Sequence, residues 1–206
     1  MRSSLETLVP GLDVSRETID RLKVFEGLVR KWTPKINLVG PSTMPDFWRR
    51  HILDSSQLFP LAPNHWQSWA DLGSGGGLPG IVIAVLAADT GKSITLIESD
   101  QRKSAFLRTC VRELGLTMTV LSSRIEAVPP LSADVVSARA LAPLPSLVGL
   151  VQRHLAPEGT ALLQKGRAAA EEVELARAEW TFDLLSHDSQ TESGARILAL
   201  KRIAHV

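Results

Sequence analysis

Four glycines stand within the five positions from Gly73 to Gly77, directly after a short apolar run. The run Ser68–Leu72 predicts a strand, and the apolar residues from Pro79 to Ala88 predict a helix. Glycine lets the backbone turn sharply and lets a ligand approach the chain closely. A strand, a glycine loop and a helix in this order predict a ligand site at the carboxyl edge of a parallel sheet.

Strands and helices alternate over the whole sequence that follows residue 66. Further strands are predicted at 93–98, 117–121, 133–137 and 160–164, with helices at 102–114, 145–155 and 168–177. The last two strands, 180–187 and 196–202, are joined by a Ser-Gly turn and no helix, so they must pair antiparallel. We therefore expect an α/β fold with a mostly parallel sheet, helices on both faces and an antiparallel last strand.

The residues before position 66 show a helical pattern instead. Apolar residues at three- to four-residue spacing predict a helix from Ser15 to about Trp32, ended by Pro34, and a second helix from near Ser42 to Leu58. We expect two units: residues 1–65 as a helical extension that packs on the sheet, and residues 66–206 as the ligand-binding domain. The segment 1–13 has no apolar core of the kind that signal peptides carry, so no signal peptide is expected.

Composition excludes some classes of protein. The single cysteine, Cys110, excludes an intramolecular disulfide framework and a multi-cysteine metal site. No apolar run approaches the roughly 20 residues that span a bilayer, so we expect a cytoplasmic protein without membrane contact. The scattered histidines suggest no metal site.

Charge is unevenly distributed, although 23 basic residues nearly balance 22 acidic ones. Residues 21–50 hold seven basic and two acidic residues, a net +5 that suits phosphate. Residues 171–192 hold seven acidic residues and one arginine, a net −6. We expect the acidic segment to point away from any nucleic acid.

The spacing of the glycines separates several kinds of nucleotide site. A dinucleotide fingerprint needs glycine where Leu78 stands, and a nucleophile elbow needs glycine in place of Leu72. A P-loop needs Lys-Ser/Thr where the chain has Ile81-Val82. What remains is Asp-x-Gly-x-Gly-x-Gly, followed by Glu98 at the end of the next strand. An acid there can accept hydrogen bonds from ribose hydroxyls, which leaves the identity of the nucleoside cofactor open.

This pattern resembles the class I S-adenosylmethionine-dependent methyltransferases over roughly Ser68 to Arg202. The resemblance implies a Rossmann-like fold with a seven-stranded sheet and S-adenosylmethionine as cofactor. It places the first, third and fifth residues of the glycine loop against the methionine part, Glu98 on the ribose and residues 124–126 beside the adenine. The implied cofactor-binding residues are Asp71, Gly73, Ser74, Gly75, Gly77, Leu78, Glu98, Arg124, Ile125, Glu126 and Arg139.

The residues at the end of the fourth strand limit which chemical groups could accept the methyl group. The strand is followed by Ala138-Arg139-Ala140 rather than the Asn/Asp-Pro-Pro-Tyr motif of amino-methylating enzymes, and the chain has no tyrosine. Cytosine-C5 methylation needs a nucleophilic cysteine, whereas Cys110 falls in a predicted helix away from the strand edge. Methylation of guanine N7 needs neither that motif nor a cysteine nucleophile, because the N7 lone pair is free and no general base is required. Arg139 is then the candidate catalytic residue that positions the guanine, through O6.

Motifs along nearly the whole chain resemble one family, the bacterial ribosomal RNA small-subunit methyltransferase G family (RsmG, also called GidB). They are Asn37-Leu38, Arg50-His51-Ile52-Leu53-Asp54-Ser55, the glycine loop, Ser137-Ala138-Arg139-Ala140 and Gln164-Lys165-Gly166. The resemblance implies N7 methylation of a guanine, number 527, in the 530 loop of 16S rRNA. The implied partner is 16S rRNA in the small ribosomal subunit or its precursor, bound by a monomer.

The RNA-binding candidates are Arg49, Arg50, His51, Asp54 and Lys165. His51 and Asp54 stand three residues apart, either lining the mouth of the substrate site or fixing the extension on the sheet. Three other functions remain open from the sequence alone. They are a methyltransferase acting on a protein or small molecule, an NAD(P)-dependent oxidoreductase, and a non-catalytic RNA-binding or assembly factor.

Overall fold

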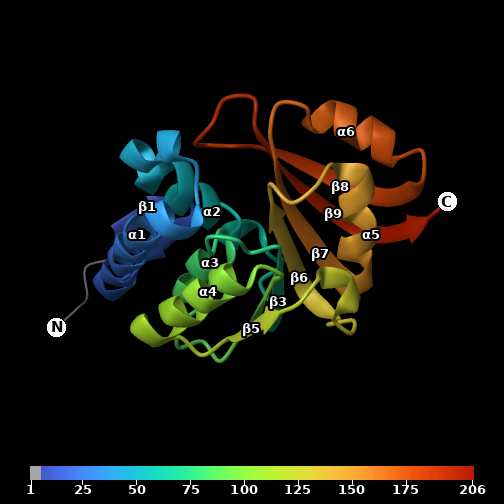
Figure 1. Cartoon of the computed structure of the whole chain (residues 1–206). Helices are drawn as coiled ribbons and strands as arrows, with labels where there is room; N and C mark the ends of the chain where they lie inside the picture. The colour runs from blue at the N-terminus through green and yellow to red at the C-terminus, as the bar shows by residue number, and fades with distance from the viewer. Residues whose placement is uncertain (1–5) are drawn as a thin grey trace.

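The computed structural model describes residues 6–206, and its centre is a twisted seven-stranded sheet (Figure 1). The spatial order of the strands is β5-β4-β3-β6-β7-β9-β8. Five neighbouring strands pair parallel, and β9 pairs antiparallel with both β7 and β8. The predicted mostly parallel sheet with an antiparallel last strand is confirmed. The strands are β3 (Ser68–Leu72), β4 (Ser93–Glu98), β5 (Thr119–Ser122), β6 (Ala133–Arg139), β7 (Leu155–Lys165), β8 (Trp180–Asp188) and β9 (Arg196–His205).

Helices cover both faces of the sheet, as the alternation predicts. On one face α1 (Arg16–Ile36) packs on α3 (Gly80–Leu86) and α4 (Gln101–Glu113), and on the other lie α5 (Leu144–His154) and α6 (Ala169–Ala176) (Figure 1). Each face has its own apolar core. The chain order reverses between β3 and β6, which is where ligands bind in open α/β sheets.

The helix α1 begins where the sequence predicts and ends later. Ser15 caps it, accepting a hydrogen bond from the Thr18 N–H at 3.2 Å. Helix α1 continues through Pro34 to Ile36, so the prediction that Pro34 ends it is wrong. Proline removes only its own N–H, and the helix closes when Asn37 adopts a left-handed conformation and donates to the Thr33 carbonyl at 2.9 Å.

The second predicted helix is a composite, so the prediction of one regular helix is wrong. A 3₁₀ turn η1 (Pro41–Asp46) leads into a π-helix η2 (Trp48–Leu53), a short α-turn α2 (Asp54–Ser56) and a 3₁₀ turn η3 (Phe59–Leu61). Two prolines inside η1 donate no N–H, which prevents a regular α-helical ladder there. π-Helical turns are rare and are frequent at functional sites.

An N-terminal hairpin precedes α1 and was not predicted from the sequence. Strands β1 (Glu6–Val9) and β2 (Leu12–Val14) pair antiparallel around Pro10-Gly11, a dipeptide typical of turns. Residues 1–5 lie outside the described residues, and with them part of the segment for which no signal peptide is expected. Within residues 6–206, no helix is long and apolar enough to cross a membrane.

The N-terminal segment packs closely on the sheet domain. Phe59, Trp66 and Trp69 form a row of ring contacts, with centroids 6.1 and 5.2 Å apart, across the proposed boundary at residue 65. Their apolar core is shared with α1 and α3. The division into two units therefore stays a prediction, drawn through a continuous core.

Candidate cofactor and substrate site

The glycine loop joins β3 to α3 with positive φ angles, a backbone conformation that residues with a side chain rarely adopt. Gly75 has φ +53°, and a Cβ added there would meet nothing closer than the Gly73 carbonyl oxygen at 3.7 Å. Gly77 has φ +82°, and a Cβ there would lie 2.6 Å from Ile81 Cγ1. The loop therefore leaves open space above Gly75 and packs tightly against α3 at Gly77.

Asp71 lies beneath this loop, fully buried. Its Oδ1 accepts a hydrogen bond from Ser137 Oγ at 2.7 Å and its Oδ2 accepts one from the Gly80 N–H at 3.2 Å. Burial raises the pKa of the Asp71 carboxyl to about 6. Asp71 therefore ties β3 to β6 and to the start of α3.

A cavity of about 510 Å³ lies over the loop, and we call it the glycine-loop cavity. Its volume is in the range of small-molecule sites. Asp71 and Gly77, predicted to bind cofactor, do not line it; both support the loop from below. Leu38, Lys103 and Leu141 also line it and were not predicted to bind cofactor; of these, Leu38 belongs to the motif Asn37-Leu38. The predicted residues that line it are Gly73, Ser74, Gly75, Leu78, Glu98, Arg124, Ile125, Glu126 and Arg139.

Glu98 forms one wall of the glycine-loop cavity at the end of β4. Its two oxygens accept hydrogen bonds from the Gly75 N–H at 2.8 Å and the Asp100 N–H at 2.7 Å. Each carboxylate oxygen keeps a second lone pair that can accept from a hydroxyl group. A fixed carboxylate beside an open, side-chain-free loop is the arrangement that a nucleoside cofactor such as S-adenosylmethionine fits.

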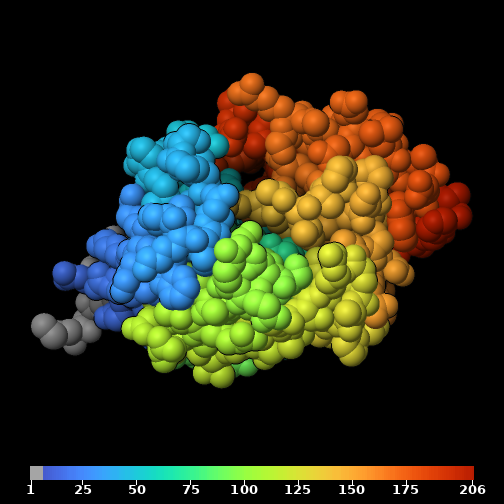
Figure 2. Space-filling view, in the orientation of Figure 1, coloured from blue at the N-terminus to red at the C-terminus, as the bar shows by residue number. Residues whose placement is uncertain are grey.

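A second cavity of about 610 Å³ lies beside the first, and we call it the His51 cavity. Figure 2 shows a hollow between the light-blue segment near residue 50 and the red and orange C-terminal part of the chain. Both cavities are lined by Arg139, Ala140, Leu141 and Ala142. This segment is the wall at which the two cavities meet.

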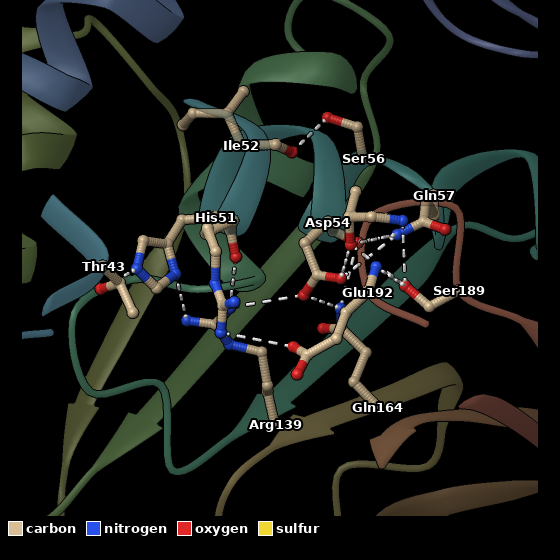
Figure 3. A network of polar contacts seen from close by, with 12 residues as sticks. Thr43, His51, Ile52, Asp54, Ser56, Gln57, Arg139, Gln164, Ser189 and Glu192 are labelled. Carbon is tan, nitrogen blue, oxygen red and sulfur yellow. Dashed lines mark hydrogen bonds and ion pairs between the residues drawn. The ribbon is translucent and has the colours of Figure 1, made fainter. Parts of the chain in front are cut away.

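Arg139, at the end of β6, holds the centre of a polar cluster (Figure 3). Its Nη2 donates to His51 Nδ1 at 3.0 Å, and its Nη1 lies 3.4 Å from Asp54 Oδ2 and from the Arg50 carbonyl oxygen. Arginine only donates, so His51 Nδ1 must accept and its proton must lie on Nε2, 2.8 Å from Thr43 Oγ1. Burial, then the charges of the two arginines, lower the pKa of His51 to about 3, so the ring is neutral.

Asp54 gathers donors from distant parts of the chain. Its Oδ2 also accepts from Gln164 Nε2 at 2.6 Å, and its Oδ1 accepts from Thr191 Oγ1 at 2.6 Å and Gln57 Nε2 at 3.2 Å. His51 and Asp54 therefore line the His51 cavity and attach the N-terminal segment to β6 and β7; that this cavity is the mouth of the substrate site stays a prediction. Thr191 and Gln57 were not predicted, and no local sequence signal marks them.

The predicted RNA contacts differ in how exposed their charges are. Arg49 is exposed and lies 3.8 Å from Asp46, whereas Arg50 lines the His51 cavity and pairs with Glu192 at 3.3 Å. The Lys165 side chain is only 8% exposed, and its ammonium pairs with Glu172 at 2.8 Å. The geometry of Lys165 favours a structural role over the predicted contact with RNA.

The acidic segment 171–192 was predicted to point away from RNA, but two of its members lie at the His51 cavity. Glu172 and Glu192 line the His51 cavity, where each is paired with a cation. Cys110 is fully buried in α4 and lines neither cavity, and burial raises the pKa of its thiol to about 12. Cys110 is therefore not placed to act as a nucleophile.

Comparison with known proteins gives a consistent result. The sequence model of a family described as GidB, rRNA small subunit methyltransferase G, matches residues 18–199. A protein of Ruegeria sp. named Ribosomal RNA small subunit methyltransferase G is 52% identical over 197 residues, which are 95% of this chain and 96% of that protein. A protein of the same name from Paracoccus denitrificans is 51% identical over 195 residues, covering 94% and 100% of the two chains.

Solved structures agree on the fold. A SAM-dependent methyltransferase from Aquifex aeolicus superposes with a TM-score of 0.58 at 13% identity, over 85% of this chain and 97% of that one. The structure of a fibrillarin/Nop5p complex gives a TM-score of 0.56 at 12% identity, over 75% and 82% of the two chains. The class I methyltransferase fold predicted from the sequence is confirmed. Because the family model matches residues 18–199, which are most of this chain, the chain belongs to the rRNA small subunit methyltransferase G family.

Proposed function

We propose that the protein transfers a methyl group from S-adenosylmethionine to N7 of guanine 527, in the 530 loop of 16S rRNA. The rRNA is carried by the small ribosomal subunit or its precursor. Membership of the family supports rRNA as the substrate, and the two adjoining cavities support transfer between a nucleoside cofactor and a base. We further propose that the protein acts as a monomer in the bacterial cytoplasm, without a metal ion.

The glycine-loop cavity is the proposed cofactor site. Gly73 and Gly75 would lie against the methionine part, Glu98 would accept from the ribose hydroxyls, and residues 124–126 would flank the adenine. When bound, S-adenosylmethionine supplies a methyl group on a positively charged sulfur. The remaining work of the chain is to orient the acceptor atom and to exclude water.

The position of Arg139 is the main support for the proposal, because this residue lines both cavities. Its Nη1 and Nη2 atoms hold the Asp54–His51 cluster, and within residues 6–206 its Nε–H has no partner. That N–H is free to donate to guanine O6 while N7 keeps its lone pair for the methyl group. Guanine N7 carries no proton, so the neutral His51 and the paired Asp54 need not act as bases.

The proposed RNA contacts are Arg49 and Arg50 on the rim and the cluster of His51 and Asp54 inside. Arg49 is 59% exposed at its side chain, so it is the cation best placed to meet phosphate. An Arg49→Ala variant should bind RNA more weakly and with a smaller dependence on salt, without a change in cofactor affinity.

The test is to map N7-methylguanosine in 16S rRNA from cells with and without the protein, by chemical cleavage at the modified base. The expected result is loss of the modification at guanine 527 alone, restored by the wild-type chain. In an assay with purified protein, Arg139→Lys should methylate rRNA about 100-fold more slowly than the wild type, since lysine lacks the planar guanidinium group of arginine. Arg108→Ala, on the exposed face of α4, is the matched control. An unaltered 16S rRNA would overturn the proposal and point to a protein or small-molecule substrate.

A further inference from the structure

We infer that Lys165 and Glu172 are positioning residues that fix the segment 140–144, which carries three of the four residues of the wall shared by the two cavities. For the identity of the methyl acceptor, this inference rests on the proposed function. Neither residue needs to touch cofactor or RNA in this role. Lys165 stands at the end of β7 and Glu172 in α6, so both are carried by regular elements.

The segment 140–144 controls the shape of both cavities. Its first residue, Ala140, has φ +52°, a conformation that a side chain disfavours and that neighbouring contacts must hold. Leu141 lies directly over the glycine loop, because a Cβ on Gly73 would meet Leu141 Cδ1 at 2.5 Å. A shift of this segment would therefore change the cofactor site and the proposed guanine site together.

The Lys165–Glu172 pair holds the segment at two points. The Lys165 ammonium donates to the Ala142 carbonyl oxygen at 2.6 Å and to Glu172 Oε2 at 2.8 Å. The same Glu172 Oε2 accepts from the Leu144 N–H at 2.7 Å. Leu144 begins α5, where the first amides have no partner within the helix and attract a carboxylate. Lysine thus holds one backbone oxygen, and glutamate holds a backbone N–H two residues on.

Burial makes the two charges interdependent. The side chains of Lys165 and Glu172 are 8% and 22% exposed. Removal of one partner leaves the other buried without its counter-charge, which destabilises a protein more than removal of both. A pair that only stabilises the fold therefore predicts recovery in the double apolar variant. A pair that positions the wall predicts recovery of stability alone, because Ala142 and Leu144 still lack their partners.

The experiment compares Lys165→Met with the double variant Lys165→Met/Glu172→Leu. The single variant should lower kcat for methyl transfer to small-subunit particles about 100-fold, as expected for a misplaced reacting group. If the wall is correctly placed one-tenth of the time, Kd for S-adenosylmethionine rises about tenfold. Amide exchange at Leu144 should become faster in the double variant, which removes the acceptor of that N–H. The double variant should regain stability in urea while kcat and Kd stay altered.

The control removes an exposed pair that lines neither cavity, Arg202→Met/Asp183→Leu, and should leave kcat and Kd unchanged. Recovery of wild-type kcat and Leu144 protection in the double variant would overturn the inference. Cofactor titration and amide exchange do not depend on the RNA substrate. If wild-type protein fails to methylate rRNA, these two readouts still decide whether the pair fixes the wall.

Discussion

Replacement of Asp54 by asparagine tests whether the polar cluster is what holds Arg139 at the junction of the cavities. The carboxylate accepts four side-chain hydrogen bonds: from Arg139 at 3.4 Å and Gln164 at 2.6 Å on Oδ2, and from Thr191 at 2.6 Å and Gln57 at 3.2 Å on Oδ1. An amide of the same shape offers one oxygen and one NH₂ group. The substitution therefore changes charge and acceptor number with little change in volume.

The loss of stability in Asp54→Asn is the sum of the changes in these four hydrogen bonds. The Thr191 hydroxyl can rotate and accept, so the NH₂ group is expected on the Oδ1 side, and the bonds from Arg139 and Gln164 remain as bonds to a neutral oxygen. A bond to a charged group contributes about 1.5–3 kcal/mol and a neutral one about 1, so these two bonds lose roughly 1 kcal/mol each. Gln57 Nε2 loses its bond to the side chain of residue 54 and keeps those to the Asp54 backbone oxygen at 3.2 Å and to Thr191 Oγ1 at 3.4 Å. We expect a total near 3 kcal/mol, or a fall in Tm of roughly 6–12 °C for a chain of this size.

The assay measures urea unfolding, cofactor affinity and methyl transfer for the same preparation. Asp54→Asn should lower kcat by about 10- to 100-fold, because Arg139 loses the anion that orients it. Kd for S-adenosylmethionine should change less than about threefold, since Asp54 lines only the His51 cavity.

Asp134→Asn is the matched control for Asp54→Asn. Its carboxylate accepts three hydrogen bonds from Gln67 and Ser68, far from both cavities, so it should lose stability and keep kcat. An Asp54→Asn protein with less than about 1 kcal/mol of destabilisation and wild-type kcat would show that Asp54 does not hold Arg139 in place.

Three further substitutions follow from the same geometry. Glu98→Gln should raise Kd for S-adenosylmethionine at least tenfold in calorimetry, since its NH₂ group cannot accept from ribose; unchanged affinity would contradict the ribose assignment. The lowered pKa of His51 means that the folded state binds fewer protons than the unfolded state between pH 3 and 6.5. The neutral His51 therefore contributes stability above pH 6.5, and this contribution is lost as the pH falls toward 3, by up to about 1.4 kcal/mol per pH unit. In His51→Gln, the urea concentration at the unfolding midpoint should fall less steeply with decreasing pH than in the wild type. Gly80→Ala would bring Cβ to 2.6 Å from Asp71 Oδ2 and should cost about 1–3 kcal/mol in thermal melts; a wild-type Tm would show that the loop is loosely packed.

The parts of the fold that the sequence predicts well are those determined by neighbouring residues. The glycine loop, the strand before it and Glu98 lie within about 30 residues, and the alternation of strands and helices follows from local apolar periodicity. The same local rules fail around residues 34–58. There, Pro34 interrupts one hydrogen bond without ending α1, and the segment after it combines 3₁₀, π and α turns. Propensity alone does not show that tertiary packing will stabilise a π-helix.

The polar cluster shows a different limit, because its contacts join residues that are far apart in the chain. Asp54 meets Gln164 and Thr191 across 110 and 137 residues, so no motif or spacing predicts those bonds. The charge count over residues 21–50 makes Arg50 a candidate for phosphate contact, and the Gln164-Lys165-Gly166 motif makes Lys165 another. In the folded chain each is paired with an acid from the segment that was expected to lie elsewhere.

A sum of charges over a window is therefore informative only for side chains that the fold leaves free, and the exposed fraction of each side chain decides which these are. Arg49 is 59% exposed and lies 3.8 Å from an exposed Asp46, so it is free to meet phosphate, and that contact stays a prediction. Lys165, also a cation predicted to meet phosphate, is instead buried and holds the Ala142 carbonyl oxygen and Glu172, which is the basis of the positioning role proposed for it. For Lys165, the motif marks a residue that matters to the site, while the structure is needed to say what it does there.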